Sequence, residues 1–168
     1  MKTENKTKMS FENISFESAK KMWEEYVSDI VKTISSEVPI IDKWEMRKMR
    51  VNVCEKEENG LKKRCGSLHK YFTELELQKE NVEKIFSLFQ KFSNDIGLRV
   101  ERNKNNEKDL DRYDFEAMND NTDDSLSCDI YLPNEWNNPH ISISVFVGPR
   151  YRKIDLESTI MNSKESDN

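Results

Sequence analysis

Residues 50–65, RVNVCEKEENGLKKRC, have the pattern of a β-hairpin. Asn59-Gly60 is the preferred dipeptide of a two-residue type I′ turn. Such a turn places Cys54 directly opposite Cys65 and sets charges of opposite sign across the two strands, apart from one facing pair of lysines. The stretch therefore predicts two antiparallel strands in a defined register.

In this register Cys54 and Cys65 are placed to form a cross-strand disulfide. They would occupy a hydrogen-bonded pair on the more polar face, where the wider Cα separation is less favourable for a disulfide. The alternative is two unrelated thiols in a cytosolic protein. A disulfide would indicate export, because disulfides persist in oxidising compartments. Cys128 alternates with Ile130 and Leu132, so we expect it in the core.

The composition indicates one polar, folded domain. The chain has 168 residues, of which 35% are hydrophobic and 35% charged, and its eight Phe and three Trp argue against disorder. A net charge of -5 without a basic stripe argues against nucleic-acid binding. The sequence contains no run of 18 apolar residues that could span a membrane. The residues after Met1 also lack the apolar core of a signal peptide. The polar start fits either a cytosolic protein or one whose export signal has been removed.

Two segments have the apolar spacing of amphipathic helices. The first runs from Phe16 to Val38, with Ser15 as N-cap and Pro39 as the stop. The second runs from Val82 to Ile96 and is closed by Gly97. Each has one apolar stripe, which must be buried against another layer.

Alternating segments predict the strands. Met49 to Val53 begins the hairpin, while Tyr71 to Leu77 is either a strand or the capped start of the second helix. Leu98 and Val100 begin a strand that leads into a polar stretch, 102–111. Three further strands are expected at 113–118, 126–132 and 140–147, separated by a turn at 120–124 and a loop at 133–139.

This order predicts an α+β two-layer sandwich, an antiparallel sheet with two amphipathic helices on one face. We expect a polar tether at residues 1–14, a single domain at 15–157 and a disordered tail at 158–168.

The sequence lacks a recognisable catalytic or metal-binding constellation. His69 follows Cys65 by four residues, but no third group orients a Cys-His pair, and nothing marks His140 as catalytic. The cysteine and histidine spacing does not complete a zinc site, and the acidic residues at 109–111 and 120–124 lack calcium-loop spacing. We expect no catalytic residue, no cofactor and no metal; the rival enzyme reading is a small hydrolase that uses Cys65 or His140.

Trp136 is the residue most indicative of function. It stands in a polar loop beside Asn134 and Glu135. An aromatic side chain there either folds back on the core or anchors a partner protein. Trp23 and Trp44 are expected in the core.

The order of these elements resembles the LppA-like lipoproteins of actinobacteria, small cell-surface proteins without an established activity. The resemblance spans residues 16–150. It rests on the helix 19–38 followed by Trp44, on Asn59-Gly60-Leu61 before Cys65, on the helix 82–96 closed by Gly97, and on Tyr113-Asp114 followed by the strand 141–148.

The chain also departs from that family. It has no lipobox cysteine, and Gly148-Pro149-Arg150-Tyr151 stands where family members can carry a later cysteine. Cys54 would then replace that cysteine as the partner of Cys65. The resemblance implies an ectodomain tethered outside the membrane by a lipid, with residues 1–10 as spacer, and it implies no catalytic residue.

We therefore expect a non-enzymatic protein-binding domain, a bacterial surface lipoprotein ectodomain with an immunity-type or accessory role. The alternative is a cytosolic antitoxin or inhibitor that neutralises a partner protein. The expected partner is another protein, or a second copy bound through an open sheet edge. Contact with a membrane is expected only through a lipid anchor absent from this chain.

Overall fold

The computed structural model of the chain describes residues 11–48, 51–54 and 61–157. It has an α+β architecture, as the sequence predicts. The helices and strands follow in this order: α1 Phe16–Glu37, β1 Glu45–Arg47, β2 Val51–Val53, β3 Lys63–Ser67, β4 Lys70–Glu74, α2 Lys79–Asp95, β5 Arg99–Asn103, α3 Asn105–Leu110, β6 Arg112–Asn119, β7 Asp124–Tyr131 and β8 His140–Tyr151.

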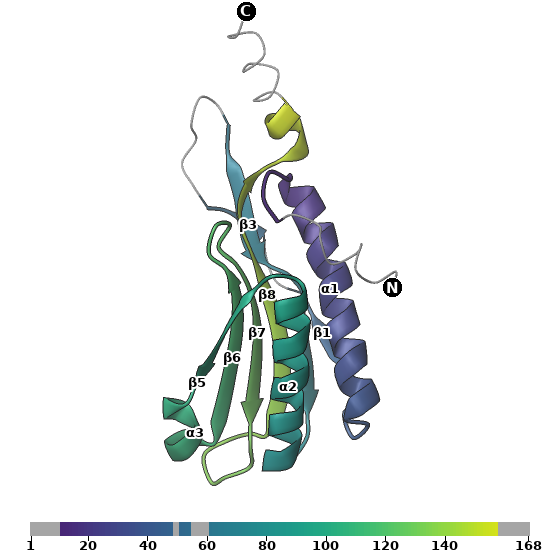
Figure 1. Ribbon diagram of the computed structural model, residues 1–168, viewed down its shortest axis with the longest axis vertical. Helices are drawn as coiled ribbons and strands as arrows, with labels where there is room; N and C mark the ends of the chain where they lie inside the picture. The colour runs from purple at the N-terminus through teal and green to yellow at the C-terminus, as the bar shows by residue number, and fades with distance from the viewer. Residues whose placement is uncertain (1–10, 49–50, 55–60, 158–168) are drawn as a thin grey trace, which may run out of the picture.

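The described strands form one antiparallel sheet around the long strand β8 (Figure 1). The order is β1-β4-β8-β7-β6-β5. The first half of β8 pairs with β4 and its second half with β3, which in turn pairs with β2. Strands β3 and β4 therefore succeed one another along the same edge of β8, which explains why β8 extends beyond the predicted end at Val147.

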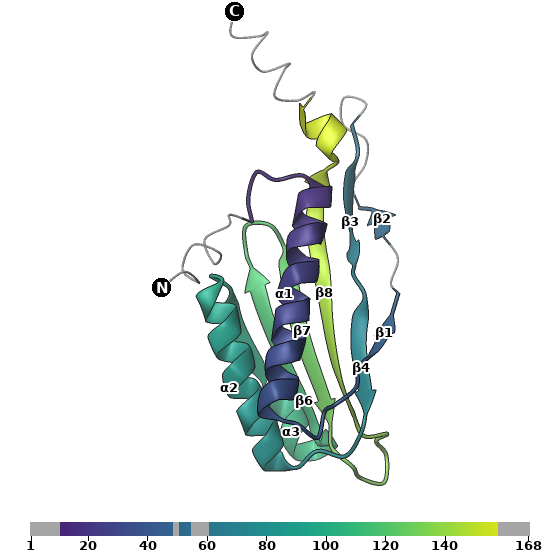
Figure 2. The same ribbon diagram turned by 90° about the vertical axis from the view of Figure 1, so that its right-hand side faces the viewer.

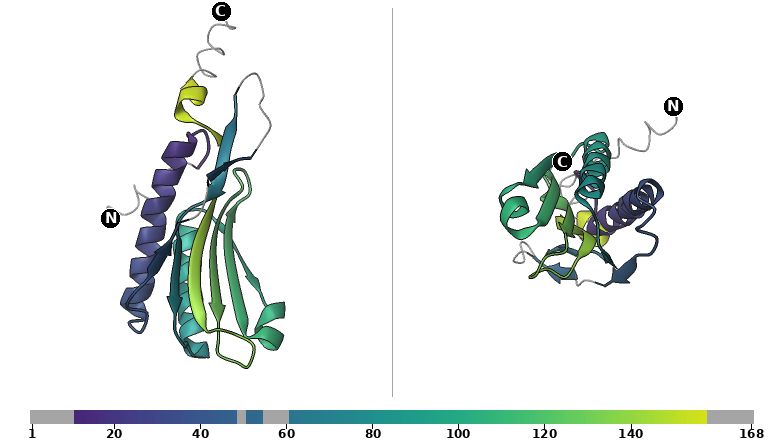
Figure 3. Two further views of the ribbon diagram at one scale, coloured as in Figure 1. Left: turned by 180° about the vertical axis from the view of Figure 1, so that it is seen from behind. Right: turned by 90° about the horizontal axis from the view of Figure 1, so that it is seen from below.

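The helices α1 and α2 lie side by side on one face of the sheet (Figure 2). Every second residue of β6, β7 and β8 points at them, so that Phe115, Cys128 and Ile143 form one buried row across the three strands. Trp23 from α1 and Phe89 from α2 are fully buried in the same core. The predicted two-layer sandwich is therefore confirmed, and the other face of the sheet is uncovered by helices in the described part of the chain (Figure 3).

The predicted ends of α1 and the end of α2 agree with the structure within one residue, whereas α2 begins at Lys79 and not at Val82. The Ser15 hydroxyl accepts a hydrogen bond of 3.1 Å from the backbone N–H of Ser18 and so caps α1. Gly97 follows α2 with a φ of 82°, a conformation that favours glycine. The described helices include none with the length and apolar character needed to cross a bilayer.

The predicted hairpin register was wrong by two residues. Asn52, not Cys54, lies opposite Cys65. The reason is that β3 is also paired along its other edge with β8, with a register shift between Arg64 and Gly66, so the turn alone does not set its position. The expected Asn-Gly turn at 59–60 lies outside the described residues.

Other expectations need correction. No helix was predicted in the polar stretch 102–111, but it includes the end of β5 and α3, a short helix without buried residues and hence without an apolar stripe. The expected tether extends too far, because Phe11 is buried against Trp23 and belongs to the core. Trp44 is only partly buried; it packs against Tyr71 and donates a hydrogen bond to Ser35.

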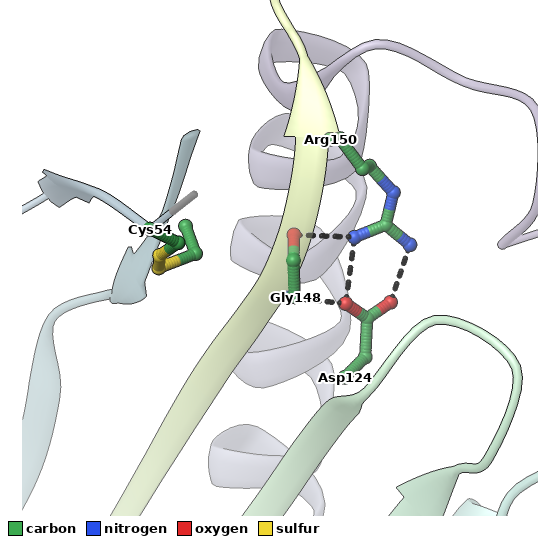
Figure 4. The surroundings of a disulfide bond; sticks show 5 residues. Cys54, Asp124, Gly148 and Arg150 are labelled. Atoms are coloured by element: carbon green, nitrogen blue, oxygen red, sulfur yellow. Dashed lines mark hydrogen bonds and ion pairs between the residues drawn. A yellow bond between two sulfur atoms is a disulfide. The ribbon is translucent and has the colours of Figure 1, made fainter. Parts of the chain in front are cut away.

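Asp124 was expected in a solvated turn, yet it is fully buried in an ion pair with Arg150 (Figure 4). Both guanidinium nitrogens Nη1 and Nη2 lie 2.6 Å from the carboxylate oxygens of Asp124. The backbone N–H of Gly148 also donates to this carboxylate at 2.7 Å, and Arg150 donates to the carbonyl of Phe11 at 2.7 Å. The pair thus ties β7, β8 and the segment before α1 together.

Gly148 is required by the close approach of the β6–β7 turn. A Cβ atom at this position would lie 1.8 Å from the carbonyl oxygen of Thr122. The next residue, Pro149, lies beside the register shift of β3, where a strand tolerates the loss of a backbone N–H.

We expect Asp124→Asn to lower the free energy of unfolding by about 3–5 kcal/mol, because it leaves the Arg150 guanidinium buried without a counter-charge. Urea unfolding at pH 7 measures the effect. The matched control is Asp123→Asn, one residue away, which is exposed and adopts a left-handed φ of 62° that asparagine tolerates. A loss below about 1 kcal/mol for Asp124→Asn would contradict a structural role for the pair.

Candidate protein-binding surface

The loop between β7 and β8 presents Trp136 to solvent. The side chain is 85% exposed, more than any other large apolar residue in the described part of the chain. Of the two alternatives that the sequence left open, the structure excludes a tryptophan folded back on the core. Glu135, beside it, is also exposed, whereas Asn134 is half-buried.

Asn134 and Asn137 brace this loop against the rest of the domain. The Asn134 side-chain oxygen accepts hydrogen bonds of 2.7 Å from the backbone N–H groups of both Trp136 and Asn137. The Asn137 amide donates to the carbonyls of Leu110, at 2.6 Å, and Leu132, at 3.3 Å. The backbone that holds Trp136 is thus fixed by side chains at either side of it, and the indole is not needed for the fold.

The end of α3 forms a second part of this surface. Leu110 closes the helix and is 50% exposed. The Asn134 amide donates to the Asp111 carboxylate at 3.1 Å, which joins the loop to the residue after α3. Trp136 and Leu110 are therefore two exposed apolar side chains on segments that are hydrogen-bonded to one another. Both segments, α3 and the β7–β8 loop, lie at the lower end of the sheet in Figure 1.

Stacked rings hold the two ends of the loop together on the outer face of the sheet. Tyr131 and His140 lie opposite each other in the register, with ring centroids 4.5 Å apart. Phe72 stacks on the other face of His140 at 5.0 Å, Arg112 covers Tyr131 and Arg47 covers Phe72. The rings present their edges to solvent because their faces are occupied by one another.

Next to these rings lies a pair of carboxylates. Asp114 on β6 and Asp129 on β7 are directly opposite in the register. The Arg112 guanidinium donates to Asp114 at 2.9 Å and lies 3.5 Å from an oxygen of Asp129. The amide of Asn106 on α3 also donates to Asp114, at 2.8 Å.

The environment drives the pKa values of these two carboxyl groups apart. Burial, a hydrogen bond to Asp114 and the Asp114 charge raise the pKa of Asp129 to about 7. Burial alone would also raise the pKa of Asp114, but hydrogen bonds from Asp129 and Asn106 and the Arg112 charge outweigh it and lower that pKa. Near neutral pH, therefore, Asp129 is only partly ionised, whereas Asp114 is ionised.

Cys54 and Cys65 form a disulfide with a Cα–Cα distance of 5.6 Å, as expected (Figure 4). Cys54 is exposed, but Cys65 is buried, which corrects the expectation that both lie on a polar face. Cys128 is fully buried, which raises the pKa of its thiol well above its usual range. His69 lies beside α1 in a small pocket with Tyr71. The ranges 11–48, 51–54 and 61–157 contain no cluster of three potential metal-ligating side chains.

Leu110, Asn137 and the Arg112–Asp114–Asp129 cluster were not identified from the sequence as parts of a site. Leu110 stood in a polar stretch in which no helix was predicted. Asp114 and Asp129 each lie on the polar face of an alternating strand, but only the register of β6 against β7 brings them together.

No protein-family model matches the sequence, and no curated protein matches it. Among solved structures, the chain is similar to the crystal structure of a DUF4853 family protein from Actinomyces odontolyticus. The two are 15% identical, the match covers 82% of this chain and 69% of that chain, and the TM-score is 0.49. This likeness is too distant to indicate a function.

We expect the free energy of unfolding of Asp129→Asn to rise relative to that of the wild-type protein as the pH increases from 5 to 8. In the folded protein Asp129 keeps its proton up to about pH 7, whereas the unfolded chain releases it near the ordinary pKa of 3.8. Its contribution to stability is therefore lost as the pH rises between these values. The asparagine variant does not have this loss.

Urea unfolding of both proteins at pH 5, 6, 7 and 8 measures the difference. Ser127→Ala, a change on the same face of β7 that removes no titrating group, is the control and should follow the wild-type pH profile. An Asp129→Asn profile parallel to the wild-type one would contradict the raised pKa.

Proposed function

We propose that this chain is a non-enzymatic protein-binding domain that works outside the cytosol, displayed at a bacterial cell surface in an immunity-type or accessory role. The observation that carries the proposal is the Trp136 side chain, 85% exposed on a loop braced by Asn134 and Asn137. Tryptophan is the residue type most enriched among the anchors of protein interfaces.

The energetics of the loop support an anchor. Burial of a tryptophan ring removes about 150–250 Å² from water, worth roughly 4–6 kcal/mol before the costs of association. A braced backbone lowers the ordering cost, because only the indole must be immobilised on binding. The exposed Leu110 on the neighbouring segment extends the apolar area.

The Cys54–Cys65 disulfide supports the location. Disulfides are maintained in the periplasm and at cell surfaces and are rare in the cytosol. The resemblance to LppA-like lipoproteins points the same way, and it also implies a lipid tether, for which residues 1–10 would be the spacer.

Site-specific photo-crosslinking in the native cell tests the binding role. A photoreactive amino acid replaces Glu135, which is exposed and leaves Trp136 in place. We expect one crosslinked protein band, and we expect it to disappear when Trp136→Ala is added, because the anchor supplies most of the affinity. The control position is Lys91, exposed on α2, which should give no such band. A band that persists in Trp136→Ala, or no band from position 135, would contradict the proposal.

A further inference from the structure

The outer face of the sheet over β5, β6 and β7 is acidic and unpartnered. The register sets Glu101 directly opposite Glu116, and Asp114 directly opposite Asp129. Like charges in directly facing positions destabilise a sheet. Glu101 and Glu116 are two facing carboxylates of this kind, whereas Asp129 is only partly ionised near neutral pH. Both pairs lie on a face that no helix covers in the described part of the chain (Figure 3).

The nearby cations do not neutralise this face. Arg112 is shared between Asp114 and Asp129, and Arg99 is bound to Glu101 and Asp120. Within the described residues Glu116 has no ion pair. The surface therefore keeps an excess of negative charge where β5, β6 and β7 meet.

One further cation, Arg102, borders the same face but is fully engaged elsewhere. It donates to Glu83 and Glu107 at 2.7 Å, its guanidinium lies over the ring of Phe86, and its side chain is only 13% exposed. Arg102 therefore adds no free positive charge to the outer face.

The face is also hollowed. A groove of about 470 Å³ has four acidic residues in its lining, Glu101, Asp114, Glu116 and Asp129, beside Arg102, Arg112 and Ser127. It adjoins the candidate anchor, because Arg112 covers the ring of Tyr131, which begins the loop that carries Trp136. The groove therefore lies near the base of the loop that carries Trp136.

We propose that this groove binds a lysine- or arginine-rich segment of the partner protein that Trp136 anchors. The inference rests on the proposed function and names the chemistry of the partner. Charge complementarity selects a basic segment, since Glu116, which has no ion pair among the described residues, and the neighbouring Glu101 gain a counter-charge on binding. A second copy of this chain carries the same net charge of -5, so long-range electrostatics disfavour it as the occupant.

The test is a ¹H–¹⁵N NMR titration of the full chain with acetylated, amidated octalysine at pH 7.5 and low salt. We expect amide shifts concentrated at residues 101, 116 and 129 and at the Trp136 indole N–H, and no such shifts with octaglutamate. The variant Glu101→Gln/Glu116→Gln should weaken octalysine binding by about fivefold. The matched control is Glu80→Gln/Asp95→Asn, which removes two exposed carboxylates from α2 on the other face and should change the affinity little.

Absence of octalysine binding, shifts spread equally over α1 and α2, or equal weakening by both double variants would overturn the inference. The crosslinking assay separates it from the proposed function. If Glu101→Gln/Glu116→Gln leaves a Trp136-dependent crosslink at full yield, the basic segment is wrong and the anchor stands. If no crosslink forms at position 135, the anchor fails, whereas the octalysine result still reports on the groove.

Discussion

The buried ion pair between Asp124 and Arg150 holds one end of the sheet together (Figure 4). It joins the start of β7 to the end of β8, and through the Phe11 carbonyl it reaches the segment that leads into α1. Two charges can be buried there because nearly every lone pair and proton has a partner: the guanidinium binds both carboxylate oxygens, and Gly148 supplies a further N–H. The turn can approach β8 this closely only because position 148 has no side chain.

The other end of the sheet is organised by hydrogen bonds from side-chain amides. Asn134 and Asn137 fix the loop to the end of α3, and the stacked rings of Tyr131 and His140 hold its two ends. The Asp124–Arg150 ion pair fixes one end of the sheet, and the Asn134 and Asn137 amides fix the other. The backbone that carries Trp136 is therefore held in place. The hydrophobic core lies between the helices and the inner face of the sheet, so the outer face is available for binding.

Much of the fold could be predicted from periodicity. Helices α1 and α2 and strands β6, β7 and β8 each bury one face, and a buried face leaves a pattern of apolar spacing in the sequence. Helix α3 has no such stripe and was missed. The hairpin register was wrong because the pairing of β3 with β8 competes with the geometry of the turn, and a local rule cannot include a contact made almost 90 residues away.

The candidate site was predictable only where a local sequence feature marks it, and not where it depends on contacts between distant residues. Trp136 was identified because an aromatic residue among polar loop residues is conspicuous in a sequence, although its exposure is a property of the folded loop. Asp124 was taken for a turn residue, since nothing in the local sequence indicates that Arg150 folds over it. Asp114 and Asp129 lie on strands that were predicted correctly, but their pairing depends on a register that no local pattern specifies.

The proposed function depends on a location in an oxidising compartment, and the redox state of the three cysteines tests that location directly. The measurement is the intact mass, without reduction, of protein recovered from its native cells with free thiols blocked at lysis. We predict one blocked thiol, that of Cys128, with Cys54 and Cys65 joined in a disulfide. Three blocked thiols would contradict the extracytoplasmic assignment and favour a cytosolic inhibitor or antitoxin instead.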